Sequence, residues 1–380
     1  MHRSRKKVRV GRTPPAVTRI GFRSITVFKP RSILALTILS VLFGSLPCVA
    51  EEPGFAQRPQ PWRRRDKPIL SALTTSQSWS RVTLYSPHVI RVGGKYRMWY
   101  IGNSSATRRA DLVLGLAESD DGIRWREYEH NPILKLDDLP WGSCWQTPFV
   151  MFDQDENIYK MWFVSITGVK TNDDGRMIAG TQKLGYATSP DGVRWKIHPK
   201  PIFEYGRSPC VIKEGAGRYR MWMNSGPLKD GKRTGLLQHI YEFTSTDGLH
   251  WKQAEKPAVR PAGEQQRIVY PFVVKENGRY AMWSASHMPS GKTEIFCDES
   301  RDGSIWTPRR AAPAFSPSQD RKRFDSRYTS TPCILVEKDR YLLYYSARNL
   351  SNVYIDGEGN KRRDGAGVYH HIGVAVWPRR

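Results

Sequence analysis

The most regular feature of the chain is a pattern of apolar and aromatic runs that returns five times. Each copy starts at a proline, continues into an apolar run, turns through Gly, Asn or Asp, and returns through an aromatic run, which is typical of a β-hairpin. The prolines stand about 61 residues apart, as expected of a repeat protein. The predicted hairpins are Ser86–Tyr100, Thr147–Phe163, Ser208–Met223, Tyr270–Ser284 and Thr331–Tyr345, and they define the first to fifth repeats.

A third apolar strand follows each hairpin, and in four repeats it ends in the turn Asp-Gly-x-x-Trp. Asp-Gly suits a turn with positive φ, and the tryptophan is bulky enough to fill the gap between neighbouring sheets. We therefore interpret these turns as structural. The third strands are Leu114–Ser119, Leu184–Ser189, Tyr241–Ser245, Phe296–Ser300 and Ile372–Val376, and the turns are Asp121–Trp125, Asp191–Trp195, Asp247–Trp251 and Asp302–Trp306.

A fourth strand is predicted in the first four repeats but not in the fifth, which stops near Trp377. The N-terminal segment Trp62–Leu70 reproduces the tryptophan-to-proline spacing of the other fourth strands, so we expect it to pair with the last repeat and close a ring without an open sheet edge. The predicted fold is all-β: a five-bladed β-propeller with four-stranded antiparallel blades, occupying residues 62–380 as one domain. The fourth strands are Asn131–Leu134, Lys200–Phe203, Lys256–Val259 and Ala312–Phe315.

Residues 1–50 have the pattern of a signal peptide. Ten Lys and Arg residues and no acid precede or flank the apolar run Ile33–Leu46, and Cys48–Ala50 offers small residues at a cleavage site. We expect residues 51–61 to be a short linker and the mature protein to be exported, either periplasmic or extracellular. The alternative is an uncleaved N-terminal anchor; no other membrane contact is expected, because this apolar run is short for a membrane span.

The charge and the cysteines exclude two classes of function. Removing residues 1–50 lowers the net charge from +24 to +14, and the remaining basic residues are scattered through loops, so no nucleic-acid partner is predicted. An anionic polysaccharide remains one explanation of the positive charge. The cysteines after residue 50 have no metal-ligand spacing, so neither a metal site nor a cofactor is predicted. Cys210 and Cys333 occupy equivalent positions and are expected to be buried free thiols.

The connections between second and third strands differ in length and composition among the repeats. In a propeller they emerge on one face, where loops can carry specificity without disturbing the core. We expect the functional face there; the alternative is that the loops are solvated connectors. The connections are 103–111, 167–177, 224–238, 284–294 and 348–369.

The segments Tyr96–Tyr100, Leu184–Trp195 and Asn131–Leu134 resemble the five-bladed propellers of glycoside hydrolase families 43, 32, 62, 68, 117 and 130. The resemblance extends over residues 62–377 and selects no single family. It implies carboxylates at the starts of the innermost strands, because glycoside hydrolysis needs one carboxyl group to protonate the leaving oxygen and another to activate water or attack carbon. This sequence departs from that pattern. The residues in front of the five prolines are Ser86, Thr147, Ser208, Tyr270 and Thr331. We take the first four of them as candidate substrate-binding residues.

Four residues are candidates to replace the usual acids. Glu242 stands among apolar equivalents in its third strand, and Glu204 lies just ahead of Arg207; for both, a structural ion pair is the alternative. His88 follows the first proline and faces the channel with Ser86 only if a bulge interrupts the strand. His287 loosely resembles the histidine acid of family 117. Histidine donates protons near neutral pH, and the alternative for His88 is a core role.

Arginines and aromatic residues supply the remaining candidates. Arg207, Arg267 and Arg327 precede innermost strands, and a guanidinium group suits a uronate, sulfate or phosphate; pairing with nearby acids is the alternative. Trp145 and Tyr270 are candidates to stack on a sugar ring.

Together these patterns predict an exported glycoside hydrolase-like protein that acts on a polysaccharide or oligosaccharide, with an anionic one as a refinement. The alternatives are a non-catalytic carbohydrate-binding propeller that lacks the usual acids, and a glycoside phosphorylase.

Overall fold

The computed structural model describes residues 60–105, 111–173, 177–229, 232–233, 239–263, 265, 267–307, 312–350, 353–355, 359–363 and 369–379. Contacts divide the chain into Met1–Glu51 and Glu52–Arg380, and the description below concerns the second unit. The predicted signal peptide lies outside the described residues. Within them, no helix is both long and apolar enough to span a membrane.

The described residues form antiparallel sheets and no α-helix, which confirms the predicted all-β class with four-stranded antiparallel sheets. The first repeat contains β3 (Thr83–Val92), β4 (Lys95–Asn103), β5 (Val113–Ser119) and β6 (Arg126–Glu127). The second contains β7 (Gln146–Asp153), β8 (Ile158–Thr171), β9 (Met177–Ser189) and β10 (Lys196–Ile197). The third contains β11 (Arg207–Gly215), β12 (Arg218–Ser225), β15 (His239–Ser245) and β16 (Lys252–Gln253).

The fourth and fifth repeats belong to one eight-stranded sheet, joined by a single parallel bridge between Thr293 and Tyr328. The fourth contains β17 (Arg267–Glu276), β18 (Arg279–His287) and β19 (Thr293–Ser300), and the fifth contains β20 (Tyr328–Val336), β21 (Arg340–Arg348) and β24 (His371–Pro378). Outside these sheets lie the hairpins β13 (Leu228–Lys229) with β14 (Lys232–Arg233) and β22 (Val353–Ile355) with β23 (Lys361–Arg363), and the 3-10 turns η1 (Ser78–Ser80) and η2 (Leu136–Asp138).

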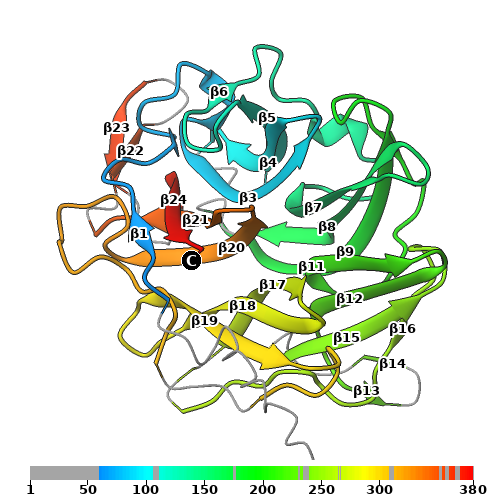
Figure 1. Cartoon of the computed structure of the whole chain (residues 1–380). Helices are drawn as coiled ribbons and strands as arrows, with labels where there is room; N and C mark the ends of the chain where they lie inside the picture. The colour runs from blue at the N-terminus through cyan, green and yellow to red at the C-terminus, as the bar shows by residue number, and fades with distance from the viewer. Residues whose placement is uncertain are drawn as a thin grey trace, which may run out of the picture. The chain divides into compact units, whose positions relative to one another are not determined.

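The first strands of the repeats contact one another in a closed cycle. β3 contacts β7, β7 contacts β11, β11 contacts β17, β17 contacts β20, and β20 returns to β3. Figure 1 shows these strands around a common centre, with later strands of each repeat further out. Because side chains alternate across a strand, one set of residues on each first strand faces this centre.

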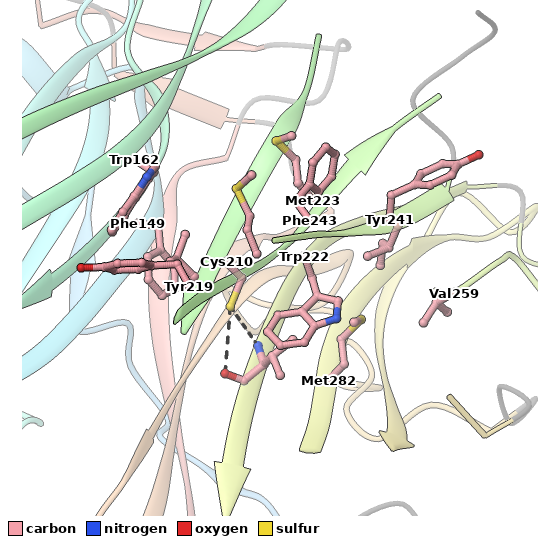
Figure 2. Close-up of a cluster of buried hydrophobic side chains, with 14 of the residues drawn as sticks. Phe149, Trp162, Cys210, Tyr219, Trp222, Met223, Tyr241, Phe243, Val259 and Met282 are labelled. Carbon is pink, nitrogen blue, oxygen red and sulfur yellow. Dashed lines mark hydrogen bonds between the residues drawn. The ribbon is translucent and has the colours of Figure 1, made fainter. Parts of the chain in front are cut away.

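The second-strand tryptophans join each sheet to the next. Trp99, Trp162 and Trp222 are fully buried, and each indole donates a hydrogen bond to the glycine carbonyl of the Asp-Gly turn in the following repeat. Figure 2 shows Trp222 of β12 in a cluster of buried side chains that also includes Trp162 from the second repeat and Met282 from the fourth. The predicted structural role of these turns therefore has a physical basis: they supply both a packing surface and a hydrogen-bond acceptor.

The segment ahead of the first repeat pairs with the last one. β1 (Arg63–Arg64) and β2 (Leu70–Ser71) both pair antiparallel with β24. Trp62 packs edge-on against Trp377 at 5.4 Å, and the amide oxygen of Gln60 accepts a hydrogen bond of 3.0 Å from the indole of Trp283. Gln60 thereby takes the place of the glycine carbonyl of the Asp-Gly-x-x-Trp turn, a sequence motif that the fifth repeat lacks.

Candidate functional site

Every first strand is interrupted at the residue in front of its proline. The pairing register with the second strand shifts there in all five repeats. The residues have positive φ angles between 41° and 59°, which cost about 1–3 kcal/mol each and are concentrated at functional sites in proteins. The bulge on which the direction of His88 depends is thus present at the first proline, and it recurs in the other four repeats. The residues concerned are the four candidates Ser86, Thr147, Ser208 and Tyr270, together with Thr331.

The residues that follow the prolines form a layer across the centre. The ring of His88 lies 4.3 Å from that of Phe149 and 5.9 Å from that of Phe272. Cys210 and Cys333 complete the layer, and each thiol accepts a hydrogen bond from a backbone N–H of the next first strand. Figure 2 shows this contact for Cys210. Both are buried free thiols, as predicted. A cavity of about 620 Å³ lies beyond this layer, toward the first hairpin turns, and its walls are mainly apolar.

His88 has the same linking role as the two cysteines. Its Nε2 lies 2.7 Å from the carbonyl oxygen of Val150 on β7, and because a carbonyl only accepts, Nε2 carries the proton. Burial lowers the pKa of His88 to about 4, so the ring is neutral at pH 7. His88 is therefore a link between β3 and β7, and this geometry does not support its candidate role as proton donor.

On the other side of the layer, polar and aromatic side chains from different repeats converge. Arg207 begins β11, and its Nη2 donates a hydrogen bond of 2.5 Å to the hydroxyl of Tyr270 on β17. The guanidinium carbon lies 5.0 Å from the centroid of the same ring. Tyr85 of β3 stacks on Tyr369 with ring centroids 5.6 Å apart, and both tyrosines interact electrostatically with Arg207. We call Tyr85, Arg207, Tyr270, His287 and Tyr369 the mouth cluster.

The positive charge of the mouth cluster comes from Arg207, because the tyrosines and the histidine are uncharged at pH 7. Burial is the main cause that raises the pKa of Tyr85 and Tyr369, so both phenols stay protonated at pH 7. Burial, with the charges of Arg207 and Arg267, lowers the pKa of His287 to about 4. His287 is paired in register with the exposed Arg267 and is a neutral acceptor at pH 7, which argues against its candidate role as an acid.

Glu242 is part of a repeated ion pair rather than of the mouth cluster. Its Oε1 lies 2.8 Å from Nε of Arg220, whose guanidinium also binds the carbonyl of Asp302 in the next repeat. Arg97 and Glu118 form the same arrangement in the first repeat, where Arg97 binds the carbonyl of Asp191. The geometry therefore favours the structural alternative for Glu242.

Replacing Glu242 tests this assignment. We expect Glu242→Gln to lower the free energy of unfolding by about 1–2 kcal/mol, because charge-assisted hydrogen bonds to Arg220 become neutral ones. Urea unfolding measures the change, and Glu118→Gln is the matched control, with a smaller loss because Glu118 is more exposed. Unchanged stability with lost ligand binding or turnover would instead return Glu242 to the site.

Three further candidates are not members of the mouth cluster. Glu204 pairs with Lys183 at 2.6 Å, and its side chain is 69% exposed, so it is not the partner of Arg207. The expectation that Trp145 stacks on a sugar is wrong: the side chain is fully buried, donates to the carbonyl of Lys135 and packs on Phe163. Arg327 lies over the ring of Tyr328 at 5.3 Å, and that ring lies 5.8 Å from the ring of Tyr369, so Arg327 borders the mouth cluster.

Sequence reasoning missed Tyr85 and Tyr369. Tyr85 occupies the position two residues before the first proline, equivalent to Arg207 in the third repeat, so comparison of that position across repeats was the available signal. Tyr369 ends the longest irregular connection, and nothing in its local sequence indicates that it returns to the centre.

The chain resembles known proteins in sequence only over part of its length. No family model matches the chain. Two uncharacterized proteins from two strains of Mycobacterium tuberculosis are each 30% identical, one over 173 residues (43% of this chain and 56% of that protein) and one over 210 residues (52% and 64%). The chain thus spans less than two thirds of the length of these relatives.

Solved structures share the fold at low sequence identity. A putative glycosidase from Bacteroides thetaiotaomicron has a TM-score of 0.58 at 15% identity, covering 84% of this chain and 97% of that one. A GH130 family structure, from work on glycoside hydrolases that target β-1,2-mannosidic linkages in Candida mannan, has 0.59 at 15%, covering 83% and 93%. An N-acetylgalactosamine deacetylase from F. plautii, in complex with blood group B trisaccharide, has 0.60 at 15%, covering 83% and 95%.

These likenesses confirm the predicted resemblance to the glycoside hydrolase propellers at the level of the fold. They do not fix the chemistry, because one fold serves different reactions and one of these neighbours is a deacetylase.

Proposed function

We propose that the protein is carbohydrate-active and binds a saccharide at the mouth cluster. The observation that carries the proposal is the convergence of Tyr85, Arg207, Tyr270 and Tyr369 from four different repeats onto one end of the central channel. Aromatic faces and hydrogen-bonding groups together are what sugar rings require, and backbone strain marks the same end. The fold shared with carbohydrate-active proteins supports the same conclusion.

The proposed architecture is a single five-bladed propeller over residues 62–380. The closed cycle of first-strand contacts supports the count of five, and the pairing of β1 and β2 with β24 supports closure by the N-terminal segment. The proposed location is outside the cytoplasm, periplasmic or extracellular, and it rests on the signal-peptide pattern of residues 1–50.

Saccharide binding predicts a specific role for Tyr369, which is partly exposed beside Arg207. We expect Tyr369→Ala to weaken binding about tenfold, because a central aromatic contact commonly contributes more than 1 kcal/mol. A glycan array identifies ligands, and calorimetry on the best one measures affinity. Tyr128→Ala is the matched control: Tyr128 is a partly buried tyrosine in the first repeat, outside the mouth cluster. Equal losses in both variants would count against the proposed site.

Hydrolysis of a glycosidic bond is the second candidate, favoured by the strain at the positions where the resemblance implies catalytic carboxylates. The described geometry favours binding instead, because none of these five positions holds an acid and the candidate Glu242 is paired with Arg220. Release of reducing sugar from a polysaccharide panel, with and without phosphate, separates hydrolysis from phosphorolysis and both from binding alone.

A further inference from the structure

Arg207 is a largely buried cation whose charge is not neutralised by any acid among the described residues. Among the described residues no carboxylate forms an ion pair with it, whereas the buried carboxylates of Asp153, Glu242 and Asp325 each bind a cationic side chain. Its hydrogen-bond partner is the neutral hydroxyl of Tyr270. Buried charges in proteins are normally paired, and no described residue supplies the anionic partner that the position of this guanidinium calls for.

The surroundings of Arg207 also favour the binding of an anion. Its Nε is buried and has no hydrogen-bond partner among the described residues, while part of the side-chain surface remains exposed at the channel end. The acid closest to Arg207 in sequence, Glu204, forms its ion pair with Lys183 instead. His287 is neutral and feels the charges of both Arg207 and Arg267, so the local potential is positive.

The rings around Arg207 hold the guanidinium in place for an incoming anion. Tyr270 lies under it with the guanidinium carbon 5.0 Å from the ring centroid, and Tyr85 and Tyr369 stack nearby. A guanidinium stacked on an aromatic ring keeps its planar edge free for a bidentate contact, which matches the geometry of carboxylate, sulfate and phosphate groups. Aromatic faces beside that edge suit the apolar face of a sugar that carries the group.

We propose that the mouth cluster binds an acidic saccharide, and that Arg207 binds its oxyanion group, a carboxylate or a sulfate. This inference rests on the proposed function and adds the substrate class. Free phosphate has the same oxyanion chemistry and is the alternative source of the group, so the experiment must separate the two.

The experiment measures calorimetric affinities of the full chain for matched ligands. The probes are a galacturonic acid trimer, a sulfated galactose trimer, the neutral galactose trimer, and inorganic phosphate. At 50 mM salt we expect an acidic trimer to bind about 10- to 100-fold more tightly than the neutral one, since a charge-assisted contact has this effect. The preference should decrease as salt increases.

Variants of Arg207 decide the assignment. We expect Arg207→Gln to remove the preference, so that the acidic and neutral trimers bind this variant with similar affinities. Arg207→Lys should retain part of the preference, because the charge remains without the planar fork. Arg194→Gln is the matched control, since Arg194 is an exposed arginine on a turn of the second repeat. Circular dichroism and urea midpoints establish that each variant folds.

The outcomes separate this inference from the proposed function. Equal affinity for acidic and neutral trimers, or a preference that survives Arg207→Gln, overturns the inference and leaves saccharide binding intact. A third outcome is that phosphate binds in an Arg207-dependent way and that, of the saccharides, only the neutral trimer binds. This outcome supports the oxyanion site but assigns it to free phosphate. If Arg207-dependent phosphate binding occurs and no saccharide binds, the anion site stands and the proposed function fails. If no probe binds, both are overturned.

Discussion

A chain that begins at Ala72 is expected to lose its cooperative fold, whereas a chain that begins at Glu52 keeps it. The shorter chain lacks β1 and β2 and therefore leaves one edge of β24 unpaired along the register that these strands occupy. Exposed sheet edges favour aggregation, and closed arrangements of sheets avoid them. Gel filtration and tryptophan fluorescence across a urea titration measure the difference.

The loss should be large because the N-terminal segment provides several kinds of contact at once. Trp62 packs on Trp377, and Gln60 accepts from Trp283. Arg64 pairs at 2.9 Å with Asp325, whose side chain is fully buried and also binds Tyr345. Leaving Asp325 with only part of its hydrogen bonds costs on the order of several kcal/mol, in addition to the lost apolar burial.

A point variant refines the same expectation. Trp62→Ala should lower the free energy of unfolding by about 3 kcal/mol, the usual cost of removing a packed aromatic side chain. Should the chain from Ala72 unfold cooperatively at the same urea concentration as the chain from Glu52, the N-terminal strands would have no role in the stability of the fold.

The fold could be predicted because its signals are local and repeated. The alternation within each hairpin and the Asp-Gly-x-x-Trp turns depend on residues close in sequence, and five copies make chance agreement improbable. The bulge at Ser86 was considered in the sequence only as a condition, attached to the proline that follows it, for the direction of His88. The structure shows that the same bulge recurs at Tyr270, where the sequence gives no additional sign of it.

The site was harder to predict because its contacts join distant residues. Arg207 and Tyr270 were each identified as candidates, but their contact spans 63 residues, and that of Tyr85 with Tyr369 crosses nearly the whole chain. Glu242 was misleading for a related reason. An acid among apolar equivalents looks functional until the neighbouring strand is seen to carry Arg220, and the pair Arg97 and Glu118 shows that the fold uses such contacts for stability.

Trp145 shows a second limit. It lies two residues before Thr147, immediately ahead of the bulge, where the strict alternation of a strand does not hold. The irregular backbone turns the indole into the core between the first and second repeats, so its sequence position did not reveal its direction.

Asp153→Asn is expected to be the most destabilising single charge removal in the second repeat. Asp153 ends β7, its side chain is 1% exposed, and its two oxygens bind Lys160 at 2.8 Å and Lys213 at 2.6 Å. Tyr219 donates a third hydrogen bond of 3.1 Å, so one carboxylate joins the second repeat to the third. The variant leaves two lysines without their shared buried partner, which costs about 3 kcal/mol.

The matched control is Asp155→Asn, because Asp155 binds the same Lys213 at 2.7 Å but is 71% exposed. An exposed pair of this kind contributes at most about 1 kcal/mol. Urea unfolding of both variants at pH 7 measures the contrast. Equal losses would mean that the burial of Asp153 has no energetic consequence.

The pH dependence gives an independent test with a defined sign. Burial alone would raise the pKa of Asp153, but the hydrogen bonds from Lys160 and Lys213 outweigh it and lower the pKa below that of an unfolded aspartate. A carboxyl group with a depressed folded-state pKa stabilises the fold above its unfolded pKa of about 3.9, and this contribution disappears as the pH falls through the lower folded value. The stability difference between the native chain and Asp153→Asn should therefore be constant from pH 7 to about 5 and shrink below pH 4. A difference that grows on acidification would show that Asp153 is not held as a carboxylate by its lysines.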